Sequence, residues 1–74
     1  MRCVVNFMWD SDAAVWIATS EDVPGLVLES GSFDALLERV KQAVPELVRL
    51  NGASAQDFKL SYRTVREDVV PCYG

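Results

Sequence analysis

The fold of this chain is decided by residues 31–52, which read GSFDALLERVKQAVPELVRLNG. The apolar residues recur at the spacing of one helix face: Phe33, Leu36, Leu37, Val40, Val44, Leu47 and Val48. Ser32 is a natural N-cap, and Asn51-Gly52 supplies a stop because glycine tolerates the left-handed conformation. The stretch therefore predicts one helix. Pro45 is expected to kink or break it near Val44, with the apolar stripe continuing through.

Three short strands are predicted before this helix. Residues 3–9 and 14–20 are rich in β-branched and aromatic side chains, and turn-forming residues 10–13 separate them. Residues 21–25 read EDVPG, in which Pro24 and Gly25 fit the two central positions of a type II turn. A third strand at residues 26–30 completes an antiparallel meander.

One further strand is predicted after the helix. Side chains alternate between residues 58 and 65, with Phe58, Leu60, Tyr62 and Thr64 on one face and Lys59, Ser61 and Arg63 on the other. Because a helix crossover usually leads to a parallel neighbour, the predicted strand order is 3-2-1-4. The predicted fold class is α+β, a two-layer βββαβ domain over residues 1–66. A loosely ordered C-terminal tail is expected at residues 67–74.

Composition limits the chemistry that this domain can perform. The chain has 74 residues, no histidine and a formal net charge of −4. Without histidine, the commonest general base and metal ligand at neutral pH is missing. The negative net charge argues against a broad phosphate-binding face. We therefore expect no enzyme, no cofactor, no metal and no direct binding of nucleic acid.

The carboxylates do not form a recognisable catalytic or metal-binding motif. Asp10, Asp12 and Glu21 superficially match a calcium loop, but Val15 stands where that loop needs glycine. The carboxylates of a two-metal nuclease would project from the middle of the first strand, where this chain has Asn6. Asp10 and Asp12 are therefore expected to cap a turn.

Targeting and cysteine usage both indicate the cytoplasm. No stretch is typical of a secretion signal or a membrane span. In the reducing cytosol, Cys3 and Cys72 are expected to stay free thiols, and neither has a histidine to activate it as a nucleophile.

The predicted sheet has one face that a single helix cannot cover. Four strands at ~4.8 Å spacing make a sheet about 19 Å wide, against about 10 Å for one helix. The first strand is apolar on both faces, with Cys3, Val5, Phe7 and Trp9 on one and Val4 and Met8 beside Asn6 on the other. The second strand repeats this, with Ala13, Val15 and Ile17 opposite Ala14, Trp16 and Ala18. This pattern predicts a homodimer or a docking surface for another protein, although scattered surface hydrophobic residues are a common alternative.

Charge is divided unevenly along the chain. Residues 3–38 hold seven acids and no base, whereas residues 39–74 hold six bases and four acids. The acids lie on the predicted hairpin and its turns, which favours a negative patch for a basic partner, or simply acidic turns that aid solubility. Tryptophan is enriched in binding hot spots, but the pattern leaves open whether Trp9 and Trp16 belong to core or interface. The candidate interface residues are Val4, Met8, Trp9, Asp10, Asp12, Trp16, Asp22 and Pro24.

Three short motifs carry a resemblance to a known family. They are Trp9-Asp10 in the first turn, Asp22-Val23-Pro24-Gly25-Leu26 at the second, and Pro45-Glu46-Leu47 followed by Asn51-Gly52 around the helix end. With these motifs, residues 3 to about 65 resemble a small prokaryotic family of unknown function that is grouped with the HicB-like antitoxins.

The resemblance implies a partial ribonuclease-H-like fold without catalytic carboxylates, which assembles into dimers or higher oligomers. HicB antitoxins bind and block HicA, a small basic RNA-cleaving toxin with a catalytic histidine. Many HicB proteins also carry a C-terminal DNA-binding domain. Because this chain ends about eight residues after its fourth strand, direct DNA binding is not expected.

Two classes of function follow from these observations. The first is a non-catalytic, HicB-type protein-binding module, a homodimer or tetramer that neutralises a HicA-like toxin. The second is a stand-alone regulatory or small-ligand-binding oligomer, with its ligand in a groove between sheet and helix.

Overall fold

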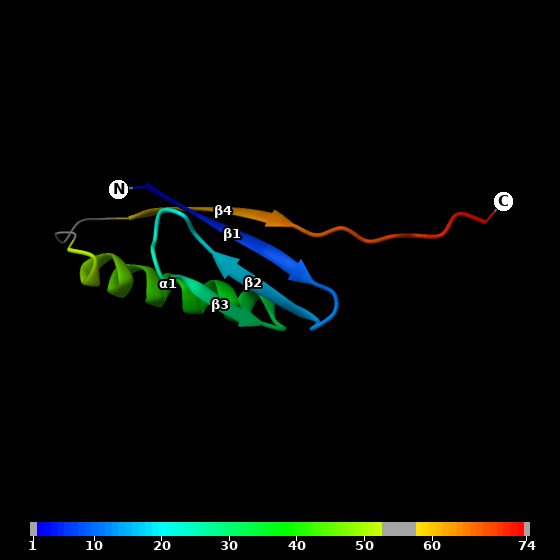
Figure 1. The fold of residues 1–74 in the computed structure, drawn as a ribbon, viewed down its shortest axis with the longest axis horizontal. Helices are drawn as coiled ribbons and strands as arrows, with labels where there is room; N and C mark the ends of the chain where they lie inside the picture. The colour runs from blue at the N-terminus through cyan, green and yellow to red at the C-terminus, as the bar shows by residue number, and fades with distance from the viewer. Residues whose placement is uncertain (1, 53–57, 74) are drawn as a thin grey trace.

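The computed structural model describes residues 2–52 and 58–73, which contain one sheet and one helix. The elements follow the order β1 (Arg2–Asp10), β2 (Val15–Thr19), β3 (Val27–Ser30), α1 (Phe33–Leu50) and β4 (Lys59–Val65). The sheet order is β3-β2-β1-β4 (Figure 1). β1 pairs antiparallel with β2 and parallel with β4, and β2 pairs antiparallel with β3. The predicted α+β class and strand order are confirmed.

The turn between β1 and β2 lies one residue later than the pattern predicted, at residues 11–14 instead of 10–13. The Asp10 carboxylate accepts hydrogen bonds from the backbone N–H groups of Asp12 (3.0 Å) and Ala13 (3.2 Å), which confirms its role as a turn cap. Ala14 has φ 55°, in the left-handed region, and therefore ends the turn rather than starting β2. The placement of Ala13 and Ala14 on opposite faces of a strand was wrong.

The turn between β2 and β3 is the predicted type II turn. The Leu26 N–H donates to the Val23 carbonyl oxygen at 3.2 Å, and Gly25 has the φ of 88° that its position requires. Val23 and Leu26 are both buried, so the turn is anchored in the core at its two ends.

The helix has the predicted ends but is not broken at its proline. The Ser32 side chain accepts a hydrogen bond from the Ala35 N–H, and Gly52, with φ 90°, follows the C-cap Asn51. α1 continues from Phe33 to Leu50 with Pro45 inside it, so of the kink or break predicted near Val44, the break does not occur. Buried residues on both sides of Pro45 hold the two halves of the helix against the sheet, which offsets the lost hydrogen bond.

The core lies between α1 and one face of the sheet. α1 packs over β2 and β3. The fully buried apolar side chains come from all the layers and from the second turn: Cys3, Val5, Phe7, Ala18, Val23, Leu26, Leu36, Val40, Val44 and Val48. One helix therefore covers one face of the sheet, and the opposite face is open.

The chain continues past β4 as an extended segment without regular secondary structure. This segment runs away from the sheet and helix (Figure 1), and the molecule measures 59 × 19 × 18 Å along its principal axes. In the part of the chain that is described, no helix has both the length and the apolar character to cross a membrane.

Candidate protein-binding face

The side of the sheet away from α1 forms one continuous surface, which we call the open sheet face. It carries the outward side chains of all four strands, in register: Val4, Asn6, Met8, Ile17, Thr19, Val27, Glu29, Ser61, Arg63 and Val65. Met8, Val27 and Val65 are 60%, 70% and 54% exposed. Apolar side chains this exposed on one flat surface are typical of a binding surface.

Strand register orders this face into rows that run across the sheet. One row contains Glu29, Ile17, Met8 and Val65, because Ile17 pairs with Glu29 and Met8 while Met8 also pairs with Val65. The next row contains Val27, Thr19, Asn6 and Arg63. Apolar side chains therefore occupy the centre of the first row, beside an acid at the β3 edge. In the second row, polar side chains lie between Val27 at the β3 edge and Arg63 at the β4 edge.

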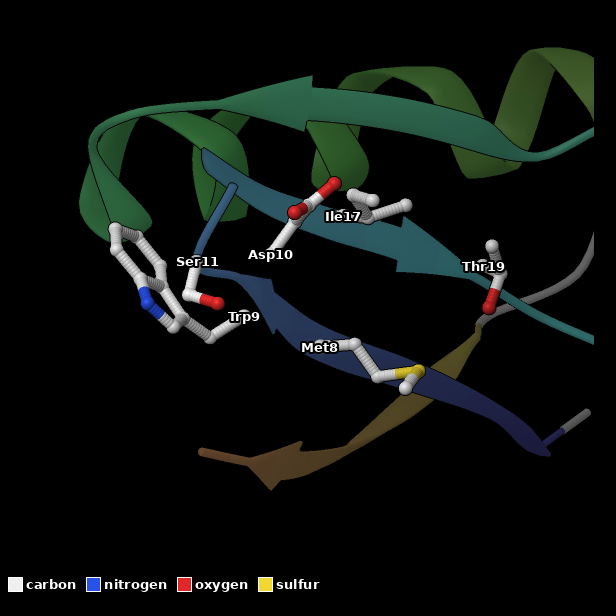
Figure 2. A pocket seen from close by; sticks show the side chains of 6 residues that line it. All are labelled: Met8, Trp9, Asp10, Ser11, Ile17 and Thr19. Atoms are coloured by element: carbon white, nitrogen blue, oxygen red, sulfur yellow. The ribbon is translucent and has the colours of Figure 1, made fainter. Parts of the chain in front are cut away.

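A hollow of about 320 Å³ lies at the hairpin end of the open sheet face. In Figure 2, Met8, Ile17 and Thr19 project from β1 and β2, while Asp10 and Ser11 lie at the turn and the Trp9 ring lies apart from them. The hollow has an apolar floor, and hydroxyl and carboxylate groups lie at its rim. It therefore suits an apolar side chain that carries a polar or basic end.

Asp22 is part of the fold at the other end of β1. Its carboxylate accepts a hydrogen bond from the Val4 N–H at 2.7 Å. The Ser20 hydroxyl donates to the Val4 carbonyl oxygen at 2.6 Å and accepts from the Asp22 N–H at 3.1 Å. These two side chains satisfy both backbone groups of Val4 where β2 has ended, so Asp22 positions Val4 on the open sheet face.

The two tryptophans lie on the helix side of the sheet. Trp16 packs against the core, with its ring centroid 5.2 Å from that of Phe33. Trp9 lies 5.4 Å from Trp16 in an edge-on arrangement, and the Arg66 guanidinium lies 4.2 Å above the Trp9 ring. Neither tryptophan contributes to the centre of the open sheet face.

The acidic residues of the predicted interface are divided between two ends of the sheet. Asp10 and Asp12 belong to the β1–β2 turn, whereas Asp22 and Pro24 belong to the β2–β3 turn. The five residues of β2 separate these turns by about 17 Å. The structure therefore does not bring the predicted negative patch together as one cluster.

Of the eight predicted interface residues, Val4 and Met8 lie on the open sheet face, and Asp10 lies at its hairpin end, where it lines the hollow. The interface prediction missed five residues of this face on the outer strands: Val27, Glu29, Ser61, Arg63 and Val65. The sequence shows these residues as part of the period-two alternation in residues 27–30 and 59–65. That alternation identifies a surface only when the strand register is known, because the register places these residues beside Met8 and Ile17.

The cysteines differ in their surroundings. Cys3 is buried and Cys72 is exposed, and both are free thiols. Burial, reinforced by the nearby negative charge of Asp22, raises the pKa of Cys3 above its ordinary value, so this thiol stays protonated and unreactive at neutral pH. Across residues 2–52 and 58–73, no group of three or more His, Cys, Asp or Glu residues could hold a metal ion.

Comparisons with known proteins match nearly the whole chain. The crystal structure of the hypothetical protein TTHA1013 from the extremely thermophilic bacterium Thermus thermophilus is 37% identical in sequence, with a TM-score of 0.80. The match covers 95% of this chain and 100% of the other. A search of the curated proteins found no match. The family model described as "Domain of unknown function (DUF1902)" matches residues 2–70. The chain therefore belongs to the DUF1902 family.

Proposed function

We propose that this protein is a non-catalytic, oligomeric protein-binding module of the cytoplasm that uses its open sheet face to cover a protein partner. The observation that carries the proposal is the set of exposed apolar side chains Met8, Val27 and Val65 on a face that no element of the described chain covers. Removing such side chains from water provides the main driving force in most protein association.

The partner that fits this surface best is a small basic RNA-cleaving protein of the HicA type, which would make this chain a HicB-type antitoxin. The acidic turns support this choice because they lie at both ends of the open sheet face, where Asp10 and Asp12 mark one end and Glu21 and Asp22 the other. A basic protein laid along the strands would meet acidic groups at each end and apolar groups between them.

The HicB-like assignment itself is part of the proposal. It is supported by the parallel pairing of β4 with β1 and by the type II turn at Val23–Leu26, which carries the Asp-x-Pro-Gly motif. The fold would then be a partial ribonuclease-H-like fold in which Asn6 takes the place of a catalytic carboxylate.

The test is inhibition of a basic ribonuclease whose reading frame neighbours that of this protein. We expect the wild-type chain to bind the purified ribonuclease and stop RNA cleavage. Met8→Glu and Val27→Glu should lose this inhibition, because each places a charge among the exposed apolar side chains. Leu50→Glu is the matched control, since Leu50 is an exposed apolar residue at the end of α1. Inhibition that survives both open-face variants, or a wild-type chain that neither binds nor inhibits, would contradict the proposal.

The hollow beside Met8 favours a second candidate, a small-ligand-binding oligomer. Such a ligand would not occupy the space between sheet and helix, because the buried core side chains fill it. Native mass spectrometry of the protein from its host would detect the added mass of a ligand. Loss of that mass in Met8→Glu would place the ligand in the hollow.

A further inference from the structure

The segment after β4 exposes apolar side chains to water. We call residues 66–73 the C-terminal arm. Val69, Val70 and Tyr73 are 98%, 80% and 90% exposed, and the arm runs away from the sheet and helix (Figure 1). Its base is held by Arg66, which lies over the Trp9 ring and forms an ion pair with Asp68 at 3.7 Å. The arm therefore leaves the domain in a set direction and presents apolar groups beyond it.

Most of the arm lies within the part of the chain that matches the family and its relative of known structure. The DUF1902 match extends to residue 70, well into the arm. The match to the Thermus thermophilus protein covers 95% of this chain, which is more than the first 65 residues can supply. An appendage peculiar to this chain would lie outside both matches.

The neighbouring edge of the sheet has room for another strand. β4 is the last strand of the sheet and pairs with β1 on one side only. Its outer edge therefore presents a row of unpaired N–H and C=O groups, which other chains can extend by adding a strand. α1 packs over β2 and β3, so the helix side of β4 is only partly covered, and Tyr62 is 38% exposed.

We propose that the C-terminal arm pairs antiparallel with β4 of a second copy of this chain. The exchange is reciprocal, so that two four-stranded sheets join into one continuous sheet across a two-fold axis. This inference deepens the proposed function by naming the oligomer partner and its surface, and it leaves the open sheet face free on both copies.

The charges and the alternation of side chains favour one register of this pairing. Arg66 lies over Trp9 on the helix side, so the alternation of β4 continues into the arm. A two-fold axis perpendicular to the sheet must then place one residue opposite its own copy. An axis at Arg66 or Glu67 would place two like charges opposite each other, which destabilises strand pairs. An axis at Val65 places two valines opposite each other.

The register centred on Val65 makes complementary pairs along its length. Arg63 lies opposite Glu67 of the second copy, and Leu60 lies opposite Val70 on the half-covered helix side. Pro71 falls opposite Lys59, the first residue of β4, where the absence of an N–H interrupts no further pairing. Val70 of the arm thus gains an apolar neighbour on β4, and the backbone of the arm pairs with the open edge of that strand.

Disulfide cross-linking tests this register directly. Facing residues of antiparallel strands have Cα atoms about 4.5–5.5 Å apart, within the range that a disulfide spans. In a Cys72→Ser background, Val65→Cys should cross-link to a covalent dimer on mild oxidation. Glu67→Cys should not, because its two copies would lie about 14 Å apart. Arg63→Cys mixed with Glu67→Cys should form the mixed dimer. Cross-linking through position 67 but not 65 would overturn the register, and cross-linking through neither would overturn the arm exchange.

A charge exchange tests the same pairing without cysteines. Arg63→Glu and Glu67→Arg should each weaken the dimer, raising its Kd roughly three- to thirtyfold over the two equivalent pairs. Mixing the two variants should restore a dimer of wild-type affinity, because each copy then offers the charge that the other needs. A wild-type chain that sediments as an 8.2 kDa monomer at 100 μM would overturn the proposal.

The test of the arm exchange can be distinguished from the test of the proposed function. Val27→Glu lies on β3, the opposite edge of the sheet from β4. It should keep the Val65→Cys cross-link while losing ribonuclease inhibition. An arm exchange without ribonuclease binding, or the reverse, therefore identifies which proposal fails.

Discussion

The guanidinium carbon of Arg66 lies 4.2 Å from the centroid of the Trp9 ring and 5.9 Å from that of Trp16. This contact joins the base of the C-terminal arm to the hairpin end of the sheet. From Trp9 the aromatic contacts continue through Trp16 and Phe33 to Phe7 in the core. A continuous series of side-chain contacts thereby joins the base of the arm to α1 and the core.

Replacing Arg66 with alanine should destabilise the domain. A cation–π contact at an exposed site contributes about 0.5–1 kcal/mol, and 1 kcal/mol shifts the Tm of a domain of this size by roughly 4–8 °C. Thermal unfolding followed by tryptophan fluorescence measures the change. Asp68→Ala is the control, since it removes the exposed ion pair of Arg66 but leaves the ring contact. If Asp68→Ala lowered the Tm as much as Arg66→Ala, the ring contact would not be the source of the stability.

Replacing Asp22 with alanine should also destabilise the fold, because the Val4 N–H would lose its acceptor. This hydrogen bond is to a charged group and lies at the protein surface. Its loss should lower the free energy of unfolding by about 1 kcal/mol. Urea denaturation measures this loss, and Asp22→Asn should retain part of the stability through its amide oxygen. Glu21→Ala, next to Asp22 in the same turn, should have little effect. Equal losses at both positions would point to the charge of the turn rather than to this hydrogen bond.

Local patterns predicted most of the fold because the chain is locally consistent. The apolar spacing of α1, the Ser32 cap and the Pro24-Gly25 turn each depend on neighbouring residues, and all three appear in the structure. The helix does not break at Pro45 because packing on both sides of the proline outweighs the local cost of proline in a helix. That packing involves residues distant in sequence, which a local pattern does not contain.

The candidate interface was harder to predict because it depends on register. Met8 becomes the centre of a surface only when β2 and β4 place Ile17 and Val65 beside it. Asp22 looks like a free surface acid in sequence, yet its carboxylate completes the hydrogen bonding of β1. The side of the sheet on which Trp9 and Trp16 lie likewise depends on where α1 packs.

Substituting Pro45 with alanine should stabilise the protein. The proline supplies no N–H to the helix and costs about 3 kcal/mol in a helix interior, while its removal gives the unfolded chain about 0.4–1 kcal/mol of extra conformational freedom. We therefore expect a net gain of about 2–2.5 kcal/mol in the free energy of unfolding, measured by urea denaturation. Gln42→Ala, at an exposed position of the same helix, should change stability by less than about 0.5 kcal/mol. A destabilised Pro45→Ala would show that the half-buried ring packs better than an alanine can.

Cys3 should make stability fall as the solution becomes alkaline. Burial and the charge of Asp22 raise the pKa of Cys3 in the folded state, so the fold favours the protonated thiol. Its contribution is fully present below the unfolded-state pKa of about 8.5 and is lost as the pH rises from there through the higher folded-state pKa. Urea denaturation between pH 7 and 10 should show this decline in the wild type, and Cys3→Ala should reduce the slope of stability against pH.

Alkylation by iodoacetamide at pH 8 should modify Cys72 rapidly and Cys3 only after denaturation, since Cys72 is exposed and Cys3 is buried. Equal rates at the two cysteines, or an unchanged slope in Cys3→Ala, would contradict this account of the thiol.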